Sequence, residues 1–256
     1  MKKLRLLVMS LLLVVGGQAM AQTRGAMFLS AAFPMKDYAE FDGFDEFALM
    51  SNDNDDAGAG IGFDVGLKWY FNVGTPGLGV MLSVDGIYNG PNADLKAAYR
   101  EATGSTGTDW LSGSFSYKST PRFINVPIML GLNYIYHFNP NLGIYVEAGA
   151  GGNMAFTTTM ESTGKLNILG IETQQTTTQK YDMGFAFAYQ AGIGLEVAKN
   201  LVIGCSFYDL GKTQAKGEQV IKSKNTITTN TTTEKNYLTL GTVHPYMIMA
   251  RIGFSF

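Results

Sequence analysis

The sequence predicts an all-β protein: an eight-stranded antiparallel up-and-down transmembrane β-barrel with long extracellular loops. Three observations support this prediction. Eight segments alternate between apolar residues and small or polar residues, the spacers between them alternate between short and long, and the chain ends within such a segment, on Phe256. Successive side chains of a strand point to opposite faces, so each segment has one apolar and one mixed face. Segments of about ten residues with this alternation are typical of strands that cross a membrane.

The first 21 residues have the pattern of a secretory signal peptide. Lys2, Lys3 and Arg5 precede an apolar core from Leu6 to Val15, and Ala19-Met20-Ala21 forms an A-x-A cleavage site. We therefore expect residues 1–21 to be removed and residues 22–256 to form one barrel domain. Beyond the leader no run of about 18 apolar residues occurs, so the sequence does not predict a membrane-spanning helix.

Each predicted strand is identified by the apolar residues on one of its sides. The first four strands have these apolar positions: Met27, Leu29, Ala31 and Phe33; Ile61, Phe63, Val65, Leu67, Trp69 and Phe71; Leu78, Val80, Leu82, Val84 and Tyr88; Ile124, Val126, Ile128, Leu130, Leu132, Tyr134, Tyr136 and Phe138. The last four have these: Ile144, Val146, Ala148 and Ala150; Phe185, Phe187, Tyr189, Ala191, Ile193, Leu195 and Val197; Leu201, Ile203, Cys205 and Phe207; Tyr246, Ile248, Ala250, Ile252, Phe254 and Phe256. Cys205 is the single cysteine, so it cannot form an internal disulfide, and its position predicts a small lipid-facing residue.

The lengths of the spacers predict the orientation of the barrel. The spacers at 73–77, 139–141 and 199–200 are short, whereas those at 34–59, 91–120, 157–182 and 211–243 are long. Outer-membrane barrels have short periplasmic turns and long extracellular loops, so both termini are expected on the periplasmic side. Threonine-rich stretches in the third and fourth long loops predict hairpins that extend their strands above the membrane. An exposed strand edge of that kind can add a strand from a partner.

A soluble β-sandwich is the alternative all-β fold. It would also alternate, but its outward faces should be rich in Lys, Glu and Thr. The mixed faces here consist mostly of Gly, Ser, Ala, Asn and Tyr, and small residues suit the interior of a narrow barrel. The composition therefore favours the barrel.

The composition also restricts the partners and the chemistry. Without its leader the chain has 16 basic and 21 acidic residues, since three of its 19 cations lie in the leader. This net charge of about −5 argues against nucleic acid as a partner. We expect no cofactor and no enzyme activity, because the two histidines, His137 and His244, have no obvious catalytic serine beside them. The acidic residues Asp53, Asp55 and Asp56 form a possible weak cation site, although Ala57 breaks the EF-hand spacing.

The inward side of the predicted strands includes a set of charged residues. They are Asp64, Lys68, Asp85, Glu147 and Arg251. Charges inside a low-dielectric shell need partners, so we expect these five to form one polar network in the lumen. The network would either fill and plug the barrel, which we favour, or gate a narrow channel. An eight-stranded barrel is just wide enough for side chains to fill it.

The stretch from Phe123 to Leu130 reads FINVPIML. It resembles the L-x-I-P-L-L-L strand of the PorT-like outer-membrane β-barrel family of Bacteroidota, with Asn125 where many members have Glu. Pro127 falls on the inward side and lacks an N–H, so we expect it at a ladder irregularity or a bulge. The terminal strand resembles the closing strand of outer-membrane barrels, which implies recognition by the barrel-insertion machinery through its terminal aromatic residue.

The resemblance implies a location in the bacterial outer membrane, in contact with outer-membrane lipid. We expect a monomer with a structural or surface-interaction role, binding an envelope or surface protein through its extracellular loops. Two alternatives remain: a narrow gated channel for small solutes, and an accessory membrane component of a secretion system.

Overall fold

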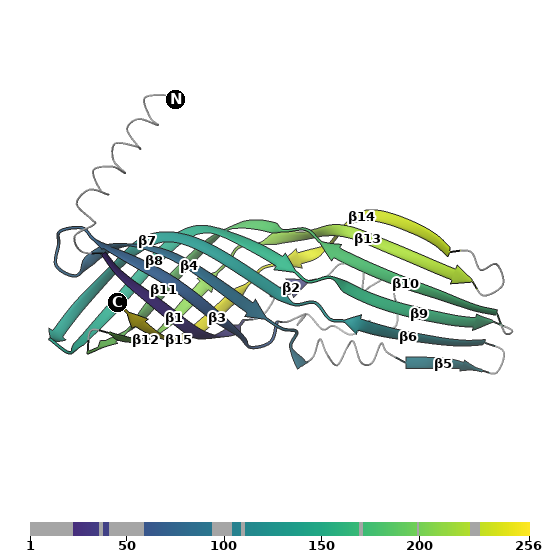
Figure 1. Ribbon diagram of the computed structural model, residues 1–256, viewed down its shortest axis with the longest axis horizontal. Helices are drawn as coiled ribbons and strands as arrows, with labels where there is room; N and C mark the ends of the chain where they lie inside the picture. Colours follow the sequence, from purple (N-terminus) through teal and green to yellow (C-terminus); the bar gives the residue numbers. More distant parts are fainter. Residues whose placement is uncertain are drawn as a thin grey trace, which may run out of the picture.

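The computed structural model describes residues 23–35, 38–40, 59–93, 104–108, 111–168, 171–198, 200–225 and 231–256. Eight of its strands form a closed antiparallel barrel in the order β1-β15-β12-β11-β8-β7-β4-β3 (Figure 1). Their bounds are β1 Thr23–Pro34, β3 Gly62–Asn72, β4 Leu78–Asn89, β7 Phe123–Asn139, β8 Leu142–Thr157, β11 Gly184–Val197, β12 Leu201–Asp209 and β15 Tyr246–Ser255. The predicted barrel and its eight strands are confirmed, and the sandwich is excluded because β1 pairs with both β15 and β3.

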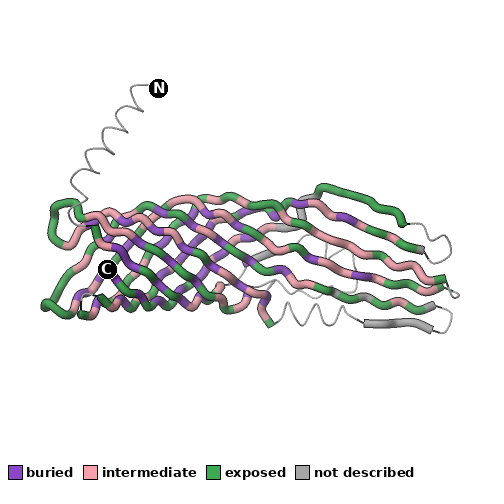
Figure 2. Tube along the Cα trace, viewed as in Figure 1, coloured by how far each residue is buried: buried purple, intermediate pink, exposed green. Residues whose placement is uncertain are grey.

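The barrel is apolar outside and polar inside. Along β15 buried residues alternate strictly with more exposed ones, and the exposed set includes Ile248, Ile252 and Phe254. The same alternation runs around the wall, so bands of buried and exposed residues cross it (Figure 2). Phe185 and Phe187 are 67% and 70% exposed on this outer wall. Large apolar side chains in such numbers on an outer surface are typical of a wall that contacts lipid. No helix in the described part of the chain is long and apolar enough to span a membrane.

The two ends of the described chain lie at the same end of the barrel as the short turns. Gly25 and Phe256 exchange backbone hydrogen bonds of 2.9 and 2.8 Å, and the Ser255 N–H donates to the Asn200 carbonyl at 2.8 Å in the turn before β12. The turn before β4 lies at this end too, since the Ile135 N–H donates to the Gly77 carbonyl at 2.8 Å. The predicted leader, residues 1–21, lies outside the described residues.

Pro127 lies at an interruption of the ladder, as predicted. Strands β4 and β7 pair Val84 with Ile128 and Ile87 with Asn125, and skip the two positions between. Because Pro127 has no N–H to donate, the wall tolerates it where this ladder is open. Asp85, one of the predicted lumen residues, lies on β4 at the same interruption.

A second sheet of seven strands continues one side of the barrel beyond its apolar wall (Figure 1). Its order is β2-β14-β13-β10-β9-β6-β5, with bounds β2 Ala39–Glu40, β5 Gly104–Thr108, β6 Leu111–Ser119, β9 Met160–Ile168, β10 Ile171–Tyr181, β13 Thr213–Asn225 and β14 Thr231–Val243. Five of these strands prolong barrel strands after breaks of two or three residues: β6 into β7, β8 into β9, β10 into β11, β12 into β13 and β14 into β15. The hairpins predicted for the third and fourth loops are confirmed. The second-loop hairpin and the joining of all three into one sheet were not predicted.

Side chains are packed at the junction between the second sheet and the barrel. Tyr181, at the end of β10, packs against the buried cluster that fills the upper lumen. Its hydroxyl donates to the Met160 sulfur at 3.2 Å or to Gln179 Oε1 at 3.0 Å. Burial raises the pKa of the Tyr181 phenol well above its ordinary value, so the ring stays neutral.

We expect the sheet to be labelled on intact cells and the short turns to be protected. The native Cys205 lies on the outer wall of the barrel, so it provides an unlabelled background in the membrane. A membrane-impermeant maleimide should modify Thr232→Cys on intact cells, and should modify Asn141→Cys only after the envelope is permeabilised. Equal labelling of Asn141→Cys before permeabilisation would contradict the orientation.

Candidate functional site

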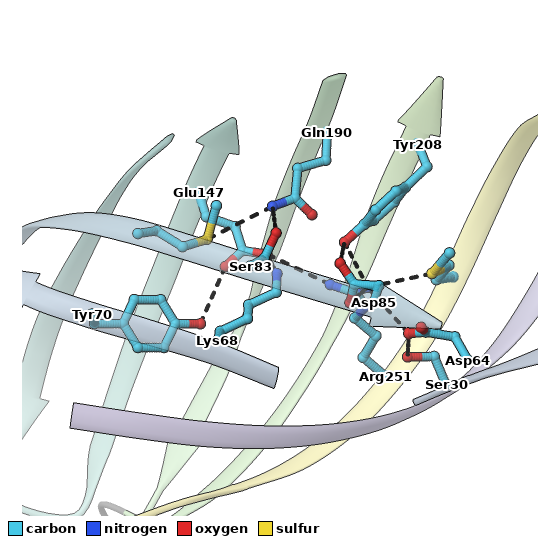
Figure 3. A network of polar contacts seen from close by, with 12 residues as sticks. Ser30, Asp64, Lys68, Tyr70, Ser83, Asp85, Glu147, Gln190, Tyr208 and Arg251 are labelled. Carbon is cyan, nitrogen blue, oxygen red and sulfur yellow. Dashed lines mark hydrogen bonds and ion pairs between the residues drawn. The ribbon is translucent and has the colours of Figure 1, made fainter. Parts of the chain in front are cut away.

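The charged residues predicted for the lumen meet in one layer across the middle of the barrel (Figure 3). Asp64 and Lys68 come from β3, Asp85 from β4, Glu147 from β8 and Arg251 from β15. Each lies on the inward side of its strand and is at most 5% exposed. Lys68 pairs across the turn with Ser83.

Arg251 is the centre of this layer. Its Nη2 lies 3.2 Å from Asp64 Oδ2 and 3.0 Å from Asp85 Oδ1, and its Nη1 lies 3.8 Å from Glu147 Oε1. Nη2 also donates to the hydroxyl of Tyr208 at 2.6 Å. Asp64, Asp85 and Tyr208 share the two N–H groups of Nη2, while the delocalised charge of the guanidinium acts on carboxylates from three strands.

Lys68 supplies the second cation of the layer. Its Nζ forms an ion pair with Glu147, and the Tyr70 hydroxyl donates to the other oxygen of that carboxylate at 3.3 Å. The ring of Phe28 lies 5.4 Å from Lys68 Nζ and 5.8 Å from Arg251 Cζ, so it contributes a cation–π contact to both. Each cation therefore has both a carboxylate and an aromatic face.

Hydroxyl groups supplement the two cations, which face three carboxylates. Ser30 donates to Asp64 Oδ2 at 2.8 Å, and Tyr208 donates to Asp85 Oδ2 at 3.1 Å. Hydrogen bonds to a buried carboxylate favour its charged form and reduce the cost of burying it. Gly66 provides the space for this arrangement, since a Cβ there would lie 2.2 Å from Asp85 Oδ1.

An uncharged layer closes the lumen between the charged layer and the second, seven-stranded sheet, which we call the extramembrane sheet. Tyr38, fully buried, enters from the first long loop, and its ring packs against Phe123 with centroids 5.2 Å apart. Its hydroxyl accepts from Asn125 Nδ2 at 3.0 Å and donates to Asn89 Oδ1 at 3.3 Å. Asn153 extends the chain by donating to Asn125 Oδ1 at 3.0 Å. These contacts tie three strands, β4, β7 and β8, to the first loop at this end of the lumen, and we call them the mouth layer.

A third polar group lies near the short turns. Arg24 of β1 pairs with Glu196 of β11 and donates to Ser255 Oγ at 2.7 Å. His137 Nε2 lies 3.5 Å from the other oxygen of Glu196. Arg24 was not predicted to face inward, because the apolar pattern of the first strand begins only at Met27.

Removing the Tyr38 hydroxyl should measure the strength of the mouth layer. We expect Tyr38→Phe to lower the free energy of unfolding by about 1–3 kcal/mol, because Asn89 and Asn125 each lose a buried partner. Equilibrium urea unfolding of the refolded barrel measures this change. Tyr88→Phe, on the outer side of β4, is the matched control, and an equal effect of both substitutions would contradict the assigned role of Tyr38.

The remaining predicted sites lie elsewhere. Asp53, Asp55 and Asp56 lie outside the described residues, and within the described part no group of three His, Cys, Asp or Glu side chains could hold a metal ion. His244 Nε2 lies 3.0 Å from Asp209 Oδ1 at the outer rim. Ser206, on the neighbouring strand β12, is buried on the lumen side. The structure does not bring His244 and Ser206 to one face of the wall.

The fold and the lumen together define a class: small closed antiparallel β-barrels with an apolar outer wall and a filled polar interior. No protein-family model matches the chain, and no curated protein matches its sequence. The PorT-like resemblance of residues 123–130 therefore stays a prediction.

Three solved structures of similar architecture share between 9% and 13% of their residues with the chain. Ail, the attachment invasion locus protein of Yersinia pestis, is 13% identical, with 91% of this chain and 97% of that chain covered and a TM-score of 0.37. Neisserial surface protein A is 9% identical, with 91% and 95% covered and a TM-score of 0.39. OprG from Pseudomonas aeruginosa is 13% identical, with 91% and 95% covered and a TM-score of 0.39.

Proposed function

We propose that the protein is an outer-membrane barrel that does not conduct and that holds a binding surface outside the cell. In this proposal residues 1–21 direct export, the C-terminal strand is read by the insertion machinery, and the barrel works as a monomer surrounded by lipid. The apolar outer wall supports the location. The observation that carries the binding role is the seven-stranded sheet, in which five of the eight barrel strands continue beyond that wall.

The filled lumen argues for anchoring rather than transport. The charged layer contains Lys68 and Arg251 with 1% and 3% of their surface exposed, and the mouth layer contains the fully buried Tyr38. Moving a solute past these side chains would break buried ion pairs and the hydrogen bonds of Tyr38, at a cost of several kcal/mol. The interior of an eight-stranded barrel is just wide enough for side chains to fill it completely.

The outer edge of the sheet is the feature best suited to a protein partner. β14 pairs with β13 along its length, but among the described residues its other side pairs only with the two residues of β2, at Thr242 and Val243. Residues 231–237 of this edge are exposed. An extended segment of another protein can pair with such an edge through main-chain hydrogen bonds.

Photocrosslinking on living cells tests the binding role. A benzophenone amino acid at Thr233 or Glu234 should give adducts of defined mass with an envelope or surface protein, whereas the same group at Phe187 on the lipid-facing wall should give none. The absence of adducts from both edge positions in cells with folded barrel would contradict the proposal. So would equal adducts from all three positions.

A further inference from the structure

The outer face of the extramembrane sheet is continuous with the lipid-facing wall. The ladder between β11 and β12 pairs Tyr189 with Asp209, and the ladder between β10 and β13 continues it in the same register, with Lys180 opposite Glu218. On β13 the inward side is fixed by Ala215, which is buried in the cluster of the upper lumen. The alternate positions of β13 therefore face outward, on the side that contacts lipid further down.

Lysines dominate this outward side of β10 and β13. Lys216, Lys222 and Lys224 share one parity on β13 and are exposed. The exposed Lys180 lies on the same face of β10, since it pairs with Glu218 of that parity. We call Lys180, Lys216, Lys222 and Lys224 the lysine ladder.

The lysine ladder has an excess of positive charge. Other lysines of the sheet are in ion pairs: Lys118 with Glu161 at 2.6 Å, Lys165 with Glu172 at 3.5 Å and Lys235 with Glu218 at 3.1 Å. Within the described part of the chain, the four ladder lysines have no carboxylate within ion-pair distance. Glu218 lies between Lys180 and Lys216 on this face, but its carboxylate pairs with Lys235, so the four ladder charges still repel one another.

The ladder begins where the apolar wall ends. Met183, Phe185 and Phe187 are exposed apolar residues of the wall, and Lys180 follows three positions further out. Lys216 is at the same height, because the Asp182 N–H donates to its carbonyl at 2.8 Å. A lipid molecule packed on this wall would therefore have its headgroup beside Lys180 and Lys216. Lysine is a common ligand of phosphate and lays its methylene stem along apolar surface.

The length of the ladder distinguishes between kinds of lipid. Lys224 lies eight residues beyond Lys216 on one strand, which corresponds to about 27 Å at 3.4 Å per residue. A phospholipid headgroup would reach only the lower pair. A glycolipid with phosphates on both its membrane anchor and its projecting sugars would reach the upper pair as well.

We infer that the lysine ladder binds a phosphorylated glycolipid of the outer leaflet, with Lys180 and Lys216 at the anchor phosphates and Lys222 and Lys224 at phosphates on the sugars above. This inference rests on the proposed outer-membrane location. It adds a lipid-binding face to the protein-binding edge of β14 and occupies a different surface of the sheet.

The test measures binding of purified lipopolysaccharide to the full mature chain, refolded in zwitterionic detergent, by microscale thermophoresis. Three double variants each change the net charge equally: Lys180→Gln with Lys216→Gln, Lys222→Gln with Lys224→Gln, and the control Lys118→Gln with Lys165→Gln. We expect the lower pair to weaken binding of both lipopolysaccharide and isolated lipid A about tenfold. The upper pair should weaken lipopolysaccharide about tenfold and leave lipid A within twofold. The control should stay within twofold for both.

Further arms identify the source of the phosphate. Dephosphorylated lipopolysaccharide should bind at least tenfold more weakly to the wild-type protein, and equal binding would overturn the inference. Tighter binding of soluble polyphosphate than of lipopolysaccharide would also overturn it. Binding of lipopolysaccharide that appears only after Asp53, Asp55 and Asp56 are changed to Asn would overturn the inference too. The acidic first loop, and not a glycolipid, would then be the ligand of the lysine ladder. Heat-dependent gel mobility measures barrel formation independently of binding. A wild-type chain that forms no barrel would count against the proposed function. Folded ladder variants that bind lipopolysaccharide as tightly as the wild type would count against the inference.

Discussion

Replacing Arg251 with methionine should lower the free energy of unfolding by about 3–5 kcal/mol, because three buried carboxylates lose their shared cation. Asp64, Asp85 and Glu147 would then face only Lys68 as a charged partner. Methionine keeps much of the volume of the arginine stem, so the loss reports charge rather than a cavity. Urea titration of the refolded barrel, followed by tryptophan fluorescence, measures the change.

Arg122→Met is the matched control for this substitution. Arg122 lies just before β7 and is exposed, so its replacement should change the free energy of unfolding by about 0.5 kcal/mol or less. A double variant with Asp85→Asn as well should recover part of the loss caused by Arg251→Met, because one unpaired charge is removed. If Arg251→Met and Arg122→Met unfold at the same urea concentration, Arg251 is not the centre of the lumen network.

Placing an arginine on the outer wall should be the second most damaging change. Ala191 lies on the outward side of β11 near the middle of the strand and pairs with Phe207 and Ala148, which face the same way. Arginine at the midplane of a barrel wall costs about 2–4 kcal/mol, because its charge must leave water for hydrocarbon. Ala191→Arg should therefore lower the free energy of unfolding in lipid vesicles by that amount.

The control substitution for Ala191→Arg is on β10, the strand that precedes β11. Thr178 of β10 is outward as well, but it belongs to the extramembrane sheet, where it pairs with Glu161 of β9. Thr178→Arg should change the free energy of unfolding by about 0.5 kcal/mol or less. Equal costs at the two positions would show that the wall of β11 is not embedded in hydrocarbon.

The barrel was predictable because side-chain period and burial follow the same rule in every strand. In β15 the apolar positions from Tyr246 to Phe254 all face outward, and that parity alone placed Arg251 inside. Once parity is known, a narrow barrel forces inward charges to meet, so the five lumen residues could be named without coordinates. Their individual pairings depended on strand register, which alternation does not define.

The position of Tyr38 and the joining of the extramembrane sheet could not be predicted, because both depend on contacts between segments that are far apart in the sequence. Tyr38 is one of four aromatic residues in an acidic loop with no periodic pattern. Its partners Asn89 and Asn125 are 51 and 87 residues away in the sequence. Threonine-rich loops predicted hairpins, but the joining of those hairpins depends on barrel strands that lie side by side only after closure. Arg24 was missed because the apolar residues that mark the parity of β1 begin only at Met27.

Single-channel conductance of the refolded mature protein in a planar bilayer tests the central claim most directly. Folding and insertion are established first by heat-dependent gel mobility. The filled lumen predicts no conductance steps from the inserted wild-type barrel. Stable steps whose size changes when Lys68 or Arg251 is neutralised would contradict the anchoring role and show that the charged layer gates a channel.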